Sequence, residues 1–120
     1  MITGASSGIG RALAVRLASG GYRVGLIARR RPELEAVAAT VEASGGRAAA
    51  AVADVGDREA LRGAVAGLEA RLGAADVMVA NAGFGAPTSL DPLNIVDVET
   101  TFRVNLLGVV YSLESVLPGM

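Results

Sequence analysis

The first residues that could do chemistry form a short glycine-rich segment near the start of the chain. In order, this segment contributes Thr3, Gly4, Ser6, Ser7, Gly8, Ile9 and Gly10. Glycines at such spacing let a backbone turn sharply, approach a bound group and pack closely on the helix that follows. The N–H groups and positive dipole end of that helix face the turn, which predicts a phosphate or other anion site. A tight strand-to-helix turn without a ligand is the alternative that the spacing leaves open.

A second group of polar residues lies at the end of the next expected strand. About 20 residues after a dinucleotide-binding turn, an acidic residue usually holds the ribose hydroxyls of the cofactor. Here Ala28 stands at that position, and Arg29 and Arg30 follow it. Alanine cannot accept a hydrogen bond from the 2′-hydroxyl, whereas an arginine suits a 2′-phosphate, so NADP is favoured over NAD. Alternatively, the arginines form a solvated surface run before a helix.

The residue types that are absent restrict the chemistry further. The chain has no cysteine and no histidine, and all 11 of its basic residues are arginine. These absences exclude Ser-His-Asp and Cys-His catalysis and any mechanism that needs a lysine amine, and we expect no metal site. A net charge of −1 gives no electrostatic reason to expect a nucleic acid partner. No apolar run reaches the roughly 18 residues of a membrane span, so we expect no membrane partner and a cytoplasmic location.

Strands that alternate with helices must position these residues. The expected strands cover residues 1–3, 22–28, 48–53 and 77–80. The expected helices run from the glycine turn to Gly20, from Pro32 to Gly45, from the N-cap Asp57 to Gly73 and from Val96 to Leu117. The side chains expected to face the core are Ile9, Leu13 and Leu17 in the first helix, Leu34, Val37, Ala38 and Val41 in the second, Leu61, Val65, Leu68 and Leu72 in the third, and Val98, Phe102, Leu106, Val109, Val110 and Leu113 in the last.

This alternation predicts an α/β fold of the Rossmann type, a doubly wound parallel sheet with right-handed crossovers. The expected strand order is 3-2-1-4, with a cofactor crevice at the carboxyl ends of strands one and four. A chain of 120 residues is at most one domain and is short for a complete α/β enzyme.

The glycine turn and three later segments resemble the short-chain dehydrogenase/reductase family. The later segments are Asp54-Val55, Asn81-Ala82-Gly83 and Val104-Asn105-Leu106, which stand in the order of the family. The resemblance implies that Asp54 and Val55 flank the adenine ring and that Asn81 ties neighbouring backbone together. It also implies that Ala82 and Gly83 lie beside the cofactor. For Asp54, a carboxylate that only caps a loop is the alternative.

Asn105 is the one residue that the resemblance places in a catalytic role. The matching asparagine of the family belongs to a catalytic tetrad and holds water for a proton relay. Helical spacing places Asn105 among apolar residues, where its amide must find partners or cost roughly 1 to 3 kcal/mol. A core asparagine that only bends its helix is the alternative.

The other three catalytic residues of the family do not occur in this chain. They are a serine and a tyrosine followed four positions later by a lysine, whereas Ser115 follows Tyr111 at that spacing. The resemblance therefore implies an incomplete NAD(P)-binding domain over residues 1–120, without the fifth and later strands. It would be the cofactor-binding half of an NADP(H)-dependent oxidoreductase for a small carbonyl or alcohol substrate, inactive by itself. The parent enzyme would pair subunits through a helix like the last one here. A non-catalytic NADP sensor and a half-domain that needs a partner chain are the alternatives.

Overall fold

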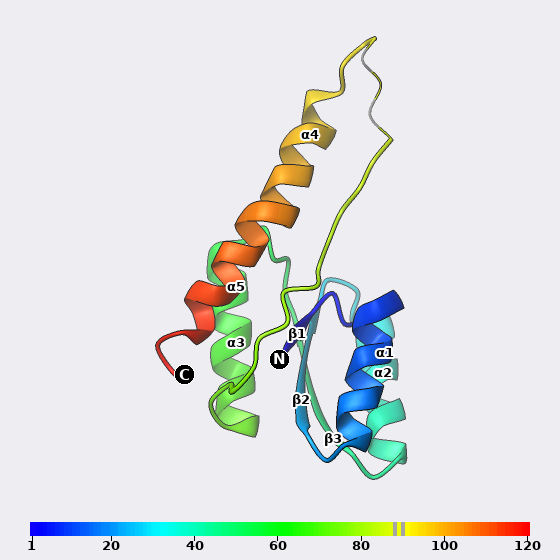
Figure 1. Ribbon diagram of the computed structural model, residues 1–120, viewed down its shortest axis with the longest axis vertical. Helices are drawn as coiled ribbons and strands as arrows, with labels where there is room; N and C mark the ends of the chain where they lie inside the picture. The colour runs from blue at the N-terminus through cyan, green and yellow to red at the C-terminus, as the bar shows by residue number, and fades with distance from the viewer. Residues whose placement is uncertain (88, 90) are drawn as a thin grey trace.

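A parallel three-stranded sheet lies at the centre of the molecule, with helices on both of its faces (Figure 1). The computed structural model describes every residue except 88 and 90. The strands are β1 (Ile2–Thr3), β2 (Arg23–Ala28) and β3 (Arg47–Val52), in the spatial order β1-β2-β3. The register places Leu26 of β2 opposite Ile2 on one side and Ala50 on the other. The chain therefore has an α/β fold of the Rossmann-like type.

Helices cover the two faces of the sheet unequally. Helices α1 (Gly8–Ser19) and α2 (Arg31–Ala43) lie on one face, and α3 (Arg58–Leu72) and α5 (Gly108–Val116) lie on the other (Figure 1). Helix α4 (Ile95–Phe102) continues into α5 through one π-helical turn, η1 (Arg103–Leu107). None of the residues of α4, all of which the structure describes, is buried. Because α4 projects from the rest, the molecule measures 51 × 29 × 20 Å.

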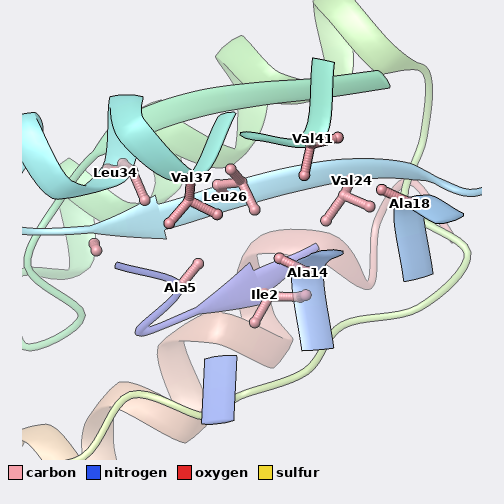
Figure 2. Close-up of a cluster of buried hydrophobic side chains, with 10 residues drawn as sticks. Ile2, Ala5, Ala14, Ala18, Val24, Leu26, Leu34, Val37 and Val41 are labelled. Carbon is pink, nitrogen blue, oxygen red and sulfur yellow. The ribbon is translucent and has the colours of Figure 1, made fainter. Parts of the chain in front are cut away.

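Two apolar clusters hold these layers together, one on each face of the sheet. Figure 2 shows the first, in which Ile2, Val24 and Leu26 of the sheet meet side chains of α1 and α2. The second cluster joins Ile27 to α3 and α5. Burying apolar side chains on both faces is what a parallel sheet needs.

The prediction of a fourth strand is wrong, because residues 77–80 form no strand in the described part of the chain. Val79 makes a single parallel bridge to Ile2. Its N–H donates to the Met1 carbonyl at 2.9 Å, and its carbonyl accepts from the Thr3 N–H at 3.0 Å. The segment therefore lies beside β1, on the side away from β2. Since β1 has only two residues, it offers too few backbone groups for a longer ladder.

The core faces of α2 and α3 are those that apolar spacing predicts. Leu34, Val37 and Val41 of α2 are buried, as are Leu61, Val65 and Leu68 of α3. Asp57 caps α3 as expected, since its Oδ1 accepts from the Ala60 N–H at 3.0 Å. The first residues of α2, β2 and β3 differ from the expected ones by a single position.

The predicted core face of α1 is correct only in part, since Leu13 and Leu17 are partly buried against the first cluster, and that of the last helix is largely wrong. In α1 the buried residues are Gly10, Ala14 and Ala18, and Ile9 is 78% exposed. The expected single helix over residues 96–117 is broken by η1, and its buried residues are Val104, Gly108, Ser112 and Val116. Phe102, Leu106, Val110 and Leu113 are exposed instead. Both helices bury a glycine where they approach a neighbouring element too closely for a side chain, at Gly10 and at Gly108. Among the described residues, no helix combines the length and apolar character that crossing a membrane requires.

Candidate functional site

The glycine turn leads from β1 into α1 through a backbone conformation that favours glycine. Gly4 has φ +66°, and Gly8 has φ +54°. Gly8 has no described atom within 4 Å of where a Cβ would stand, so this side of the turn is open. Ser7 is the N-cap of α1, and the first turn of that helix carries no acidic residue. The turn therefore presents a helix N-terminus without a carboxylate of its own, as an anion site needs.

Gly10 brings α1 into direct contact with the turn. A Cβ on this residue would stand 2.4 Å from the Gly4 carbonyl oxygen and 2.6 Å from Nδ2 of Asn81. Both distances are shorter than carbon atoms tolerate, so only glycine fits. The predicted role of Gly10 in close packing is correct, although its neighbours are the turn and Asn81 rather than the strand itself.

Asn81 and Thr3 join the turn to the segment beside it. The Asn81 amide nitrogen donates to the Thr3 carbonyl at 3.1 Å and to the Gly4 carbonyl at 3.4 Å. The buried Thr3 hydroxyl accepts from the N–H groups of Asn81 and Ala82, each at 3.1 Å. Asn81 thus ties neighbouring backbone together, as the resemblance implies.

A cavity of about 280 Å³ opens at the carboxyl ends of the strands, above the glycine turn. Most of the predicted cofactor residues line it, and these are Gly4, Ser6, Ser7, Arg29, Arg30, Asp54, Val55, Asn81, Ala82 and Gly83. The remaining lining residues are Ala28, Ala53 and Val104. The segments that supply these side chains lie far apart in the sequence, and the parallel sheet brings them to one edge.

The two arginines at the cavity have different partners. Arg30 donates to the hydroxyls of Ser7 at 3.0 Å and Ser6 at 3.3 Å, and it pairs with Glu33 at 3.2 Å. Arg29 lies 3.8 Å from a carboxylate oxygen of Asp54, and both side chains are largely exposed. Arg30 is therefore fixed over the glycine turn, whereas Arg29 reaches across the opening of the cavity towards the end of β3.

The loop after β3 is folded on itself. Asp54 accepts a hydrogen bond from the Gly56 N–H through Oδ1 at 2.8 Å, the contact that a loop-capping aspartate makes. Val55 is buried, with 5% of its surface exposed, although it lines the cavity. Its side chain packs against Gly108 at the start of α5.

Asn105 lies in the π-helical turn and finds two partners in one residue. Its Oδ1 accepts from the Phe84 N–H at 2.7 Å, and its Nδ2 donates to the Phe84 carbonyl at 2.8 Å. The amide is thus satisfied as expected, although Asn105 is exposed rather than enclosed in the core. The contact fixes the segment after Gly83 next to the helix.

Five predicted residues stand outside the lining of the cavity. Thr3 and Gly10 support the turn from behind, Gly8 and Ile9 are exposed at the start of α1, and Asn105 lies beside Gly83. Ala53 and Val104 line the cavity without having been predicted. Their only signal in the sequence is that each directly precedes a predicted residue.

The whole chain, residues 1–120, matches the sequence model of the short chain dehydrogenase family. It belongs to that family. An uncharacterized oxidoreductase of Myxococcus xanthus (strain DK1622) is 38% identical over 120 residues, which are 100% of this chain and 47% of that protein. The chain therefore spans about half the length of this relative.

Two solved structures of similar fold contain different nicotinamide cofactors. An alcohol dehydrogenase from the archaeon Thermococcus sibiricus, complexed with 5-hydroxy-NADP, is 36% identical with a TM-score of 0.92, over 98% of this chain and 51% of that one. An NAD+-bound xylitol dehydrogenase is 32% identical with a TM-score of 0.93, over 99% of this chain and 46% of that one. The likeness supports a nicotinamide cofactor in this fold without choosing between the two.

Proposed function

We propose that this chain is the NADP-binding half of a short-chain oxidoreductase that acts on a small carbonyl or alcohol substrate. The observation that carries the proposal is the composition of the cavity. Arg29, Arg30, Ser6 and Ser7 converge there, and Ala28 stands where an NAD-binding chain needs a carboxylate. Positive charge and hydroxyl donors suit a 2′-phosphate, which is the group that distinguishes NADP from NAD.

The cavity fits such a cofactor at the turn as well. Gly8 leaves open space where a side chain would stand, and the N-terminus of α1 lies beside it. We assign the pyrophosphate to this helix end, the adenine to the side formed by Asp54 and Val55, and the next part of the cofactor to the backbone of Ala82 and Gly83. The bound cofactor supplies a hydride donor or acceptor, and these residues bind and orient it.

The step from cofactor binding to turnover needs a proton donor, which this chain does not supply by itself. Asn105 carries an amide that does not titrate, and its side chain is engaged with Phe84. We propose that Asn105 holds a water molecule in the complete enzyme and that the 120-residue chain binds NADPH without turnover. The domain over residues 1–120, the pairing of subunits and a cytoplasmic location are part of the same proposal.

Cofactor titrations of matched arginine variants test the choice of NADP. We expect the wild-type protein to bind NADPH more tightly than NADH. Arg29→Ala and Arg30→Ala should each weaken NADPH binding about tenfold or more, since a hydrogen bond to a charged group contributes about 1.5 to 3 kcal/mol. Neither change should affect the affinity for NADH.

Arg31→Ala is the matched control, because Arg31 pairs with Glu35 at 3.3 Å and does not line the cavity. It should leave both affinities unchanged. Equal weakening by all three variants would indicate a general charge effect, and equal wild-type affinity for NADPH and NADH would refute the assignment to NADP.

A non-catalytic NADP sensor is the second candidate, because the residues that line the cavity account for cofactor binding alone. The two candidates differ in turnover by the complete gene product. Reduction of a panel of carbonyl compounds with NADPH, measured for the complete gene product alone and after co-expression with the neighbouring reading frame, separates them. NADPH binding without turnover in both preparations would support the sensor.

A further inference from the structure

We infer that Gly108 is a positioning residue that keeps the adenine side of the cavity open. The inference rests on the proposed function, since it concerns the same cofactor. Gly108 does not line the cavity and would not touch the cofactor. Because Gly108 has no side chain, Val55 can pack directly against the start of α5.

The contact between Gly108 and Val55 leaves no room for a side chain. A Cβ on Gly108 would stand 2.7 Å from Cγ2 of Val55, 3.1 Å from its Cβ and 3.5 Å from its carbonyl oxygen. Val55 is β-branched, so its methyl groups cannot turn away freely. A side chain at position 108 therefore has to displace Val55 as a whole or displace α5.

Val55 has the start of α5 on one side and the cavity on the other. The adjacent residue of the loop is held in the same way, because a Cβ on Gly56 would stand 3.1 Å from Cγ of Arg103. Val55 thus forms a thin layer between the start of α5 and the cofactor cavity. Any displacement of this layer away from the helix moves Val55 into the space assigned to adenine.

Helix α5 resists moving in the opposite direction. Glu114 on the same helix accepts from Nε of Arg58 on α3 at 2.8 Å, and a second hydrogen bond joins the same two side chains. Asn105, three residues before Gly108, is bonded twice to Phe84. Because these contacts hold the helix in place, a side chain at position 108 displaces Val55 rather than α5.

The test is a double-mutant cycle in the complete gene product, with calorimetric titration of 2′,5′-ADP as the probe for the adenine side. Gly108→Ala should weaken binding about tenfold, equivalent to about 1.4 kcal/mol. In the Val55→Ala background the same change should weaken binding less than about twofold, because the clashing methyl groups are gone. Gly63→Ala is the control, since Gly63 lies inside α3 with no described atom within 4 Å of an added Cβ, and it should bind as the wild type does.

Two results would overturn the inference. One is 2′,5′-ADP binding by Gly108→Ala within twofold of the wild type, and the other is an equal loss in both backgrounds, which would indicate displacement of α5. If Gly108→Ala alone fails to fold, recovery of folding and binding by Val55→Ala supports the inference, and failure to recover overturns it. A wild-type protein that binds neither 2′,5′-ADP nor NADPH would instead refute the proposed function, on which the inference depends.

Discussion

Helices α2 and α3 bury only leucine and valine side chains, whereas α1 and α5 also bury glycine, alanine or serine. The buried residues of α2 are Leu34, Val37 and Val41. Those of α5 are Gly108, Ser112 and Val116. The first pair of helices covers the sheet at a distance that leucine and valine fill. In the second pair, Gly10 and Gly108 let the helix approach its neighbour more closely than a side chain would allow.

This difference follows the position of the cavity. Gly10 of α1 lies against the turn that lines the cavity, and Gly108 of α5 lies against Val55. Close approach at these two points places the start of each helix beside the proposed cofactor site. We infer that α2 and α3 contribute mainly to stability, and that the small residues of α1 and α5 set the shape of the site.

The largest effect is expected from truncating an aliphatic side chain of α2. Leu34 is 0% exposed, so Leu34→Ala should lower the free energy of unfolding by about 2 to 5 kcal/mol through lost burial and a cavity. Urea unfolding followed by circular dichroism measures it. Leu106→Ala is the control, because Leu106 is 55% exposed, and it should change stability by less than about 0.5 kcal/mol. An equal loss of unfolding free energy in the two variants would contradict the expectation that buried aliphatic residues stabilise the fold more than exposed ones.

The opposite change, enlarging a small residue of α1, should cost less stability but also affect binding. Gly10→Ala places a methyl group 2.4 Å from the Gly4 carbonyl, and overpacking of this kind costs about 1 to 3 kcal/mol. Because the glycine turn would move, we also expect NADPH affinity to fall. Thermal melting and NADPH titration measure the two effects.

Gly67→Ala is the matched glycine variant of α3. Gly67 has no described atom within 4 Å of an added Cβ, so alanine should stabilise the helix by up to about 1 kcal/mol. NADPH affinity should not change. A Gly10→Ala protein as stable as this control would show that α1 does not need its close approach to the turn.

The comparison also explains how much of the fold could be predicted from the sequence. Apolar spacing predicted the core faces of α2 and α3 because their buried residues are also their largest apolar ones. In α1 the same rule selected Ile9, which is exposed, and missed Ala14 and Ala18, which are buried. Spacing shows which face of a helix is apolar, but the distance to the neighbouring element decides which residue sizes fit there.

For the candidate site, motifs predicted the residues around the cavity but not what supports them. The spacing of glycines and the positions at strand ends led to Arg29, Asp54 and Asn81, because parallel strands end at one edge. The layer formed by Val55 over Gly108 depends on contacts between segments more than 50 residues apart. No local pattern encodes such a contact.

Polar contacts should matter more for η1 and α5 than for α2, because Gly108 and Ser112 bury little apolar surface. Asn105→Ala removes both hydrogen bonds to Phe84 and should destabilise the protein by about 1 kcal/mol, less than Leu34→Ala, since water can reach the exposed partners. Asn105→Asp can still accept from the Phe84 N–H but cannot donate to its carbonyl. Because its second carboxylate oxygen would repel the Phe84 carbonyl oxygen, we expect a loss in urea unfolding at least as large as that of Asn105→Ala, and a stability equal to that of the wild type would argue against a contribution from this bond.

The smallest effect is expected at the ion pair that joins α5 to α3. Hydrogen bonds from the Arg58 guanidinium lower the pKa of Glu114 below its usual range. A carboxyl group with a lowered folded-state pKa stabilises the protein above its unfolded-state pKa, about 4.3, and this contribution is lost as the pH falls through the folded-state value. The stability difference between the wild type and Glu114→Gln should therefore be constant near pH 7 and shrink below about pH 4. Melting temperatures of both proteins between about pH 3 and pH 7 measure it, with Glu35→Gln on the outer surface of α2 as a second exposed carboxylate. A difference that grows as the pH falls would mean that Arg58 does not stabilise the charged form of Glu114.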